Sequence, residues 1–179
     1  AAVSSQYLTS LLLVCPLAGE DTGITLTVLN ERPYVHMTLD WLARQGIHPE
    51  FDDSLSFVRV SGRARYRPFR RRIPADFSSA AFPLCAGVLA GGRVVLEGLD
   101  MDDPQGDKAV VDILRGMGAR IETGDDVITV EGSPLRGMEI DMNAIPDAVP
   151  MMAACACFAG GTTVLGNVHQ ARIKETDRI

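Results

Sequence analysis

Four charged residues stand together in the last segment of the sequence, Lys174-Glu175-Thr176-Asp177-Arg178. The segment follows an apolar run, residues 151–168, that contains no charge. If it is helical, Lys174, Asp177 and Arg178 lie on one side, because residues three and four apart are neighbours on a helix. The ammonium group of Lys174, the carboxylate of Asp177 and the guanidinium of Arg178 would then lie close together. The alternative is the solvated first turn of a helix, since most charge runs are exposed faces.

Two sequence patterns occur twice along the chain and define the elements that must position these charges. Residues 38–62 and 109–132 each contain a helical stretch, a glycine, a strand, an Asp-Asp turn and a second strand. Residues 80–98 match residues 148–167 as an apolar helix followed by Gly-Gly and a strand. The period is roughly 70 residues, which is longer than that of solenoid repeats. Each repeat is therefore predicted to be an αβαββ block.

The patterns also predict which residues form helices and which form strands. Helices are expected over 4–17, 34–45, 78–89 and 107–117, from 148 onward, and again from 174. Strands are expected over 24–28, 47–51, 55–60, 93–97, 119–122, 127–130 and 162–165. The first helix of each repeat is apolar on every side, whereas the strands alternate and so have one solvent-exposed face. We therefore expect an α/β (α+β) fold with buried helices and outer sheets.

An anion is the ligand that such a fold favours. The buried helices would gather their N-termini at one end, each with a partial positive charge and free N–H groups, which suits phosphate. Six arginines in residues 63–72, with no acid among them, are predicted to form the crossover between two pseudo-symmetric halves. With Tyr66 and Phe69 interleaved, a nucleic-acid patch is the alternative. The formal net charge of −6 argues against it and favours an exposed linker.

The cysteines and histidines show no metal-ligand spacing. The cysteines all lie in apolar stretches, and they are Cys15, Cys85, Cys155 and Cys157. Buried free thiols and a reducing compartment are therefore expected. The histidines, expected at the surface, are His36, His48 and His169. The longest uncharged runs contain Pro or Gly and are predicted to be buried elements rather than membrane spans. The chain opens without Met, which predicts an excised or processed piece.

Several short motifs follow one another along the whole chain. They are Ser4-Ser5-Gln6, Asp76 before Ser78-Ser79-Ala80, Gln105-Gly106-Asp107, Asp141-Met142-Asn143 before Pro146-Asp147-Ala148, and the segment from Lys174 to Arg178. Together they resemble the 5-enolpyruvylshikimate-3-phosphate synthases. The resemblance implies αβαββ units in two domains, the enolpyruvyl transferase "inside-out barrel". Residues 1–72 would end the first domain, and residues 73–179 would be the first part of the second.

The resemblance also implies an activity. Such an enzyme transfers the enolpyruvyl group of phosphoenolpyruvate to the 5-hydroxyl of shikimate 3-phosphate and releases phosphate, in the shikimate pathway of aromatic amino acid biosynthesis. It implies these two small molecules as partners, with no nucleic acid, membrane, metal or cofactor, in a cytoplasmic enzyme that is monomeric at full length. This chain lacks much of the family's phosphoenolpyruvate clamp, so the isolated fragment is expected to be inactive.

The family's functional residues fall on defined positions of this chain. The implied catalytic residues are Asp147 as acceptor of the 5-hydroxyl proton, Lys174 beside that hydroxyl, and Glu175 for proton transfer at the phosphoenolpyruvate methylene. The implied substrate-binding residues are Ser4, Ser5, Gln6, Tyr34, Asp147, Gln170, Lys174 and Arg178. Ser4 and Ser5 would hold the 3-phosphate, and Arg178 would pair with the phosphoenolpyruvate anion. Structural roles are the alternatives, namely helix caps for the serines and for Asp147.

Two residues depart from the family pattern. Glu31 stands where a phosphate-contacting Ser is usual, and Gln170 stands where an Asn is common. A related enolpyruvyl transferase with another acceptor is therefore one alternative, and a non-catalytic phosphate-binding module is a second. The RNA 3′-phosphate cyclases have similar units, but they need ATP and a nucleophilic His, and the Lys-Glu-Thr-Asp-Arg pattern does not belong to them.

Overall fold

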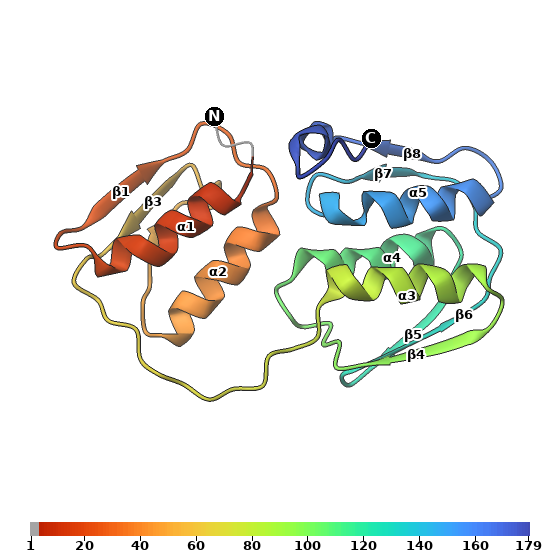
Figure 1. The fold of residues 1–179 in the computed structure, drawn as a ribbon, viewed down its shortest axis with the longest axis horizontal. Coiled ribbons are helices and arrows are strands. Elements are labelled where there is room, and N and C mark those ends of the chain that lie inside the picture. Colours follow the sequence, from red (N-terminus) through yellow and green to blue (C-terminus); the bar gives the residue numbers. More distant parts are fainter. Residues whose placement is uncertain (1–3) are drawn as a thin grey trace. The chain divides into compact units, whose positions relative to one another are not determined.

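The structure is a computed structural model that describes residues 4–179 and divides into two compact units (Figure 1). Unit 1 is Ala1–Arg71 and unit 2 is Arg72–Ile179. The division falls inside the arginine-rich segment 63–72. The assignment of residues 1–72 and 73–179 to two particular domains of a larger protein stays a prediction.

Unit 1 is a three-stranded antiparallel sheet with two helices. The helices are α1 (Gln6–Val14), which the 3₁₀ turn Cys15–Leu17 continues, and α2 (Arg32–Arg44). The strands are β1 (Thr22–Thr25), β2 (Glu50–Phe51) and β3 (Phe57–Val60), in the order β1-β3-β2. In Figure 1, α1 and α2 lie side by side, and the two helices are in contact.

The core of unit 1 follows from the spacing of its apolar residues. Leu8 and Leu12 lie one turn apart on α1 and are buried, as is Leu42 on α2. On β3, Val58 and Val60 point inward while their neighbours are exposed, the alternation of a strand with one wet face. Helical and strand periodicities thus meet in one apolar cluster between helices and sheet.

Unit 2 contains a second three-stranded sheet, three helices and a two-stranded parallel pair. Its helices are α3 (Phe77–Leu89), α4 (Ala109–Gly116) and α5 (Val149–Phe158), with 3₁₀ turns at Gly106–Lys108, Pro146–Ala148 and His169–Ile173. Its strands are β4 (Arg93–Glu97), β5 (Arg120–Gly124), β6 (Val127–Glu131), β7 (Glu139–Asp141) and β8 (Val164–Gly166). The sheet order is β4-β6-β5, and β7 pairs in parallel with β8.

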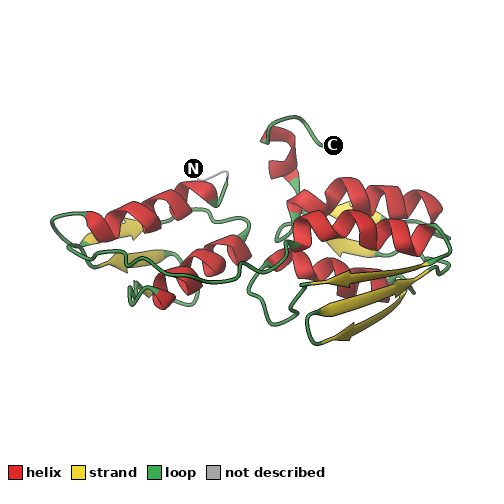
Figure 2. Ribbon diagram, turned by 60° about the horizontal axis from the view of Figure 1, so that its bottom comes forward, coloured by secondary structure: helices red, strands yellow, loops and turns green. Residues whose placement is uncertain are grey.

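The repeat predicted from the sequence is confirmed. The element order α1-β1-α2-β2-β3 of unit 1 recurs in unit 2 as α3-β4-α4-β5-β6. In both sheets the last strand is central and pairs antiparallel with the other two. Figure 2 shows the helices of each unit gathered against its strands. The α/β fold class with αβαββ units is therefore confirmed.

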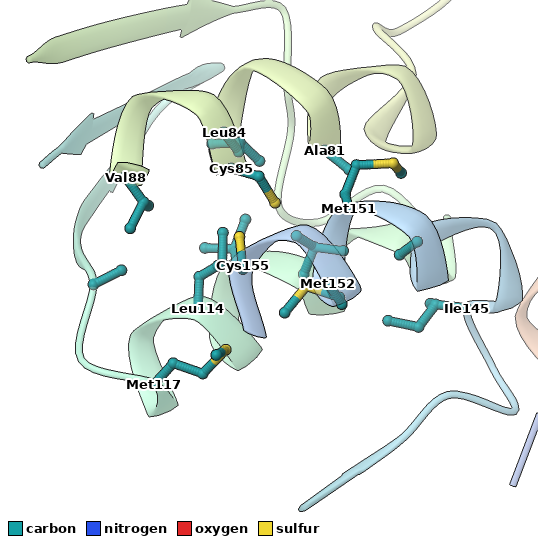
Figure 3. Close-up of a cluster of buried hydrophobic side chains, with 14 of the residues drawn as sticks. Ala81, Leu84, Cys85, Val88, Leu114, Met117, Ile145, Met151, Met152 and Cys155 are labelled. Carbon is teal, nitrogen blue, oxygen red and sulfur yellow. The ribbon is translucent and has the colours of Figure 1, made fainter. Parts of the chain in front are cut away.

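The core of unit 2 lies where α3, α4 and α5 meet (Figure 3). Leu84 of α3, Leu114 of α4 and Met152 of α5 are fully buried there. Cys85 and Cys155 lie between α3 and α5, and a hydrogen bond between these thiols, together with burial, raises the pKa of Cys85 far above its ordinary value. Both are free cysteines and buried, as predicted. The fourth cysteine, Cys157, is exposed, so the prediction that all four are buried is wrong.

Helices buried on every side were expected, and within each unit α1, α3 and α5 keep some apolar side chains exposed, such as Phe82 of α3 at 62%. On α1, the side chains of Tyr7 and Val14 are 66% and 64% exposed, and on α5 Phe158 is 74% exposed. Within unit 1, α1 packs against α2, and one neighbouring helix covers only one side. An apolar sequence allows a helix to be buried, but its side chains are buried only where another element packs against them.

Three further expectations need correction. The first strand is Thr22–Thr25, earlier than the predicted 24–28, because its register is set by pairing with β3. The strand β7 was not predicted, since three residues are too few to show an alternating pattern. The helix predicted from 174 is absent, because the chain folds back there and the Arg178 N–H donates to the Ala171 carbonyl at 3.1 Å.

No helix within residues 4–179 combines the length and the apolar character that a membrane crossing requires.

Candidate active site

The N-terminus of α1 is occupied by a side chain of the protein itself. The Glu31 carboxylate accepts hydrogen bonds from the Ser5 N–H at 3.2 Å and from the Ser5 hydroxyl at 2.9 Å, and the Ser4 hydroxyl lies 3.5 Å from the same oxygen. Ser5 and Glu31 are only 2% and 1% exposed. An acid at this position meets the positive end of the helix and makes charge-assisted hydrogen bonds.

The start of α2 brings Glu31 to this position. Glu31 is the N-cap residue of α2 and has left-handed backbone angles, φ 58° and ψ 40°. Pro33 follows in the first turn of α2, where its missing N–H and fixed φ suit a helix start. A left-handed backbone costs an L-residue about 1–2 kcal/mol. The hydrogen bonds to Ser5 offset that cost and hold the acid beside α1.

Gln6 and Tyr34, the other predicted binding residues of unit 1, flank this contact. The Gln6 side chain is exposed, and its N–H donates to the Ser4 hydroxyl at 3.3 Å. Tyr34 is half-buried in the first turn of α2. The structure therefore brings Ser4, Ser5 and Gln6 together at one helix end, with Tyr34 three residues after Glu31.

A second cluster lies in unit 2, around the guanidinium of Arg178. Nη1 of Arg178 donates to Oδ1 of Asp147 at 2.5 Å, and Nη2 donates to Oε2 of Glu175 at 2.5 Å. The Arg178 side chain is 20% exposed, Asp147 is 35% exposed and Glu175 is 74% exposed. One planar fork thus bridges two carboxylates, a geometry that arginine provides and lysine does not.

The electrostatics keep Arg178 and Glu175 charged. Partial burial works to lower the pKa of Arg178, but its hydrogen bonds to Glu175 and Asp147 outweigh burial and raise that pKa. The pKa of Glu175 lies below its ordinary value, through a hydrogen bond from its own backbone N–H and then through Arg178. Glu175 is therefore a carboxylate at neutral pH in this arrangement, ready to accept a proton rather than to donate one.

Asp177 does not join this cluster, contrary to the helical arrangement expected for the segment. Its carboxylate accepts from Arg172 at 2.9 Å and from the Ile179 N–H at 3.0 Å. The Ile179 N–H and, more weakly, Arg172 hold the pKa of Asp177 below its ordinary value. Residues 174–179 are not helical, and Asp177 pairs with Arg172 instead of sharing a face with Arg178.

Asp147 is not the N-cap of α5, so that alternative prediction is wrong. The helix is preceded by the 3₁₀ turn Pro146–Ala148, and its N-cap position is Ala148. The turn directs the Asp147 carboxylate to Arg178, 31 residues later. The structure thus gives Asp147 a long-range partner that a local capping rule does not find.

Gln170 and Lys174 lie near the same end of unit 2. Gln170 is fully buried, and its amide donates to the Asn143 carbonyl at 3.2 Å. Its side-chain oxygen has no hydrogen-bond partner within residues 4–179. Lys174 is half-buried and follows directly after the 3₁₀ turn His169–Ile173. The long buried amide of Gln170 therefore supports the turn that carries Lys174.

One polar cluster of unit 2 received no role from the sequence. Asp76 is the N-cap of α3 and accepts from the Ser78 and Ser79 N–H groups, each at 3.0 Å. Gln105 donates to Asp76 at 2.6 Å and accepts from the Phe77 N–H at 2.7 Å. Asp is a favoured N-cap residue, and Asp76 directly precedes the apolar helical stretch that begins at Phe77, so the sequence signal for this cluster was present.

The arginine-rich segment 63–72 packs against unit 1 through its aromatic residues. The Tyr66 hydroxyl donates to the Leu13 carbonyl at 2.7 Å, and the Phe69 ring lies 5.7 Å from the Trp41 ring. Arg44 and Arg71 lie over Trp41 at 5.5 and 5.7 Å. Bases stack on free aromatic faces. Both aromatic residues of the segment thus contact unit 1, while the Phe69 side chain stays 61% exposed, and the choice between a linker and a nucleic-acid patch stays a prediction.

Comparison with known proteins gives one family. The family model described as EPSP synthase (3-phosphoshikimate 1-carboxyvinyltransferase) matches residues 1–179. A relative of that name from Ruminiclostridium cellulolyticum is 52% identical over 177 residues, and one from Methanocaldococcus jannaschii is 39% identical over 179 residues. Each match covers 99% of this chain but only 42% and 41% of the relatives, so the chain spans less than half of their length.

Solved structures show the same fold. An EPSP synthase from Acinetobacter baumannii is 26% identical with a TM-score of 0.75, over 98% of this chain and 41% of that one. The enolpyruvyl transferase NikO from Streptomyces tendae is 25% identical with a TM-score of 0.72, over 89% of this chain and 38% of that one.

Proposed function

The chain belongs to the EPSP synthase family, and on that premise we propose that it is part of a 3-phosphoshikimate 1-carboxyvinyltransferase. The full-length enzyme transfers the enolpyruvyl group of phosphoenolpyruvate to the 5-hydroxyl of shikimate 3-phosphate and releases phosphate. The observation that carries the proposal is the cluster of Asp147, Glu175 and Arg178, two acids joined by one guanidinium. A cytoplasmic, monomeric enzyme without metal, cofactor or nucleic acid belongs to the same proposal.

The reaction needs proton transfer at two atoms. In the addition step, the 5-oxygen bonds to C2 of phosphoenolpyruvate as its hydroxyl proton leaves, and a proton adds to C3. In the elimination step, the C2–O bond to phosphate breaks and C3 returns a proton. A base at the hydroxyl and a group that can give and take a proton at C3 are therefore required. Asp147 serves the first role and Glu175 the second.

Arg178 couples substrate binding to both roles. In the structure its guanidinium is shared by Asp147 and Glu175. The carboxylate or phosphate of phosphoenolpyruvate competes for the same fork, because arginine binds such anions with two parallel hydrogen bonds. As the substrate takes the fork, Asp147 is released to accept the hydroxyl proton. Glu175 keeps the hydrogen bond from its own backbone N–H but loses the contribution of Arg178, so its pKa rises toward the ordinary value and it more readily holds the proton that C3 needs.

The remaining predicted residues bind the acceptor. Ser4 and Ser5 take the 3-phosphate, Gln6 lies between the two substrates, and Tyr34 packs against the shikimate ring. In unit 2, Lys174 contacts the 5-hydroxyl, and Gln170 holds the turn before it.

A second candidate function is enolpyruvyl transfer to a different acceptor. The observation that favours it is Glu31, whose carboxylate occupies the α1 terminus where a phosphate would bind. A non-catalytic phosphate-binding module is less well supported, because a module has no need for an acid pair held on one arginine.

Phosphate release by the full-length protein separates these candidates. We expect steady release with phosphoenolpyruvate and shikimate 3-phosphate together and none when either is omitted. Release with a different hydroxyl acceptor, but not with shikimate 3-phosphate, would establish the second candidate. Binding of phosphorylated ligands without release under any acceptor would establish the module.

A further inference from the structure

The N-termini of α1 and α3 each hold an acid, but one acid is distant in the sequence and the other is the N-cap residue of its own helix. At α3 the acid is Asp76, the N-cap residue itself, which accepts from the N–H groups of Ser78 and Ser79, two and three residues along the chain. At α1 the acid is Glu31, which reaches Ser5 across 26 residues of sequence and is 1% exposed. Asp76 is thus a local cap, whereas Glu31 is a buried charge brought in from another helix.

Glu31 holds the donors that an incoming anion would need. The Ser5 N–H and hydroxyl both donate to Glu31. The next two N–H groups, of Gln6 and Tyr7, donate to the hydroxyl and the carbonyl of Ser4, at 3.3 and 3.4 Å. The N–H and hydroxyl groups that could bind an anion at this helix end therefore already donate to Glu31 or to Ser4. An incoming anion also meets a like charge in a buried setting, where repulsion is much stronger than in water.

We propose that Glu31 determines the acceptor specificity of this site, as a resident anion that the phosphate of the acceptor must displace from Ser5. The inference rests on the proposed function, in which Ser4 and Ser5 bind that phosphate. Part of the binding energy of the phosphate is then used to move the Glu31 carboxylate. The site binds a phosphorylated acceptor less tightly than its serines alone would allow, and it discriminates against weaker anions that cannot displace Glu31.

Glu31→Gln tests this in the full-length protein. The amide keeps an oxygen acceptor for Ser5 but removes the charge. We expect shikimate 3-phosphate and inorganic phosphate to bind about ten- to a hundredfold more tightly to the variant by calorimetry, and unphosphorylated shikimate to bind as before. Glu50→Gln, an exposed acid of β2 in the same unit, is the matched control and should change none of the three affinities.

The possible results of this experiment distinguish the role proposed for Glu31 from the proposed function of the protein. Unchanged or weaker binding of both phosphorylated ligands to Glu31→Gln, or an equal gain for shikimate, overturns the proposal. Should the variant not fold, the Ser5 amide signal of isotope-labelled wild-type protein decides. Titration with inorganic phosphate must shift this signal if Glu31 is displaced, and an unmoved signal at saturating phosphate overturns the proposal. If wild-type protein releases no phosphate with shikimate 3-phosphate, yet Glu31→Gln gains phosphate affinity, the proposed function fails and the role of Glu31 stands.

Discussion

Arg178 is the residue on which the unit 2 cluster depends. Its two terminal nitrogens each bind a different acid, so the side chain positions Asp147 and Glu175 as well as offering a charge to a substrate. Arg178 is 20% exposed and Arg44 is 36% exposed, so the bond of Arg178 to Asp147 is less screened by solvent than that of the surface pair Arg44 with Asp40. Residue-scale predictions therefore centre on this guanidinium and on the acid that it orients.

Arg178→Lys keeps the charge and removes the fork. We expect phosphoenolpyruvate affinity of the full-length protein to fall by about tenfold or more, with a much smaller loss for shikimate 3-phosphate. Separate calorimetric titrations measure the two affinities. Arg44→Lys, on the surface of α2, serves as the control and should alter neither. Equal losses for both substrates would mean that the variant disturbs the fold around residue 178 rather than one contact.

Asp147→Asn removes the proposed base while keeping the shape of the side chain. Turnover should fall by about two to four orders of magnitude, the usual contribution of a general base, while both substrates still bind. Steady-state phosphate release and titration measure the two effects. Asp112→Asn, an exposed acid on α4, should leave turnover unchanged. Near-normal turnover of Asp147→Asn would remove this residue from the chemistry.

Among the elements, α3 has the best-defined end. Asp76 accepts two backbone hydrogen bonds there and a third bond from Gln105. Burial works to raise the pKa of Asp76, but hydrogen bonds from Ser79, Gln105 and the helix N–H groups outweigh burial and lower it. A lowered pKa in the folded state means that the carboxylate stabilises the fold above its unfolded-state pKa. The stabilisation is lost as the pH falls toward the folded-state pKa.

Asp76→Ala should therefore destabilise the full-length protein by about 0.5–2 kcal/mol at neutral pH, the usual cost of a lost N-cap. The difference from wild type should shrink as the pH falls below about 4. Urea denaturation at several pH values measures both. Asp76→Asn keeps a capping oxygen without the titrating group, so it should retain most of the stability and lose the pH dependence. A difference for Asp76→Ala that persists unchanged in acid would show that the charge is not involved.

The sequence predicted these elements well where a local pattern was sufficient. The strand β4 lies at the predicted residues 93–97, and α2 ends before the predicted stop at Gly46, whose φ of 75° suits glycine. Local patterns did not reveal β7, nor the fold-back of residues 174–179, because both depend on partners far along the chain.

The same limit applied to the site. Family resemblance pointed to Asp147, Glu175 and Arg178, and the structure places these three in contact. Glu31 was recognised as a departure from the family, but its bond to Ser5 was not foreseen, because residues 5 and 31 meet only when α1 packs on α2. The docking of Phe69 on Trp41 was missed for the same reason.

At the scale of the whole molecule, the chain spans 42% of the length of its relative from Ruminiclostridium cellulolyticum. We expect the 179-residue chain alone to show no measurable transferase activity, because groups that act as a unit in catalysis lose far more than their share when some are missing. Phosphate release by the purified chain, compared with the full-length protein at equal concentration, measures this. Steady release by the chain alone would show that its own residues suffice.

The central claim is that the full-length protein forms an enolpyruvyl ether at the 5-oxygen of shikimate 3-phosphate. Nuclear magnetic resonance of the product made from phosphoenolpyruvate labelled with carbon-13 at C2 tests it directly. The account predicts that the labelled carbon becomes an enol ether carbon coupled to the 5-position of the ring, with an equal amount of phosphate released. Label that stays in phosphoenolpyruvate, passes to pyruvate, or joins another oxygen would contradict the account.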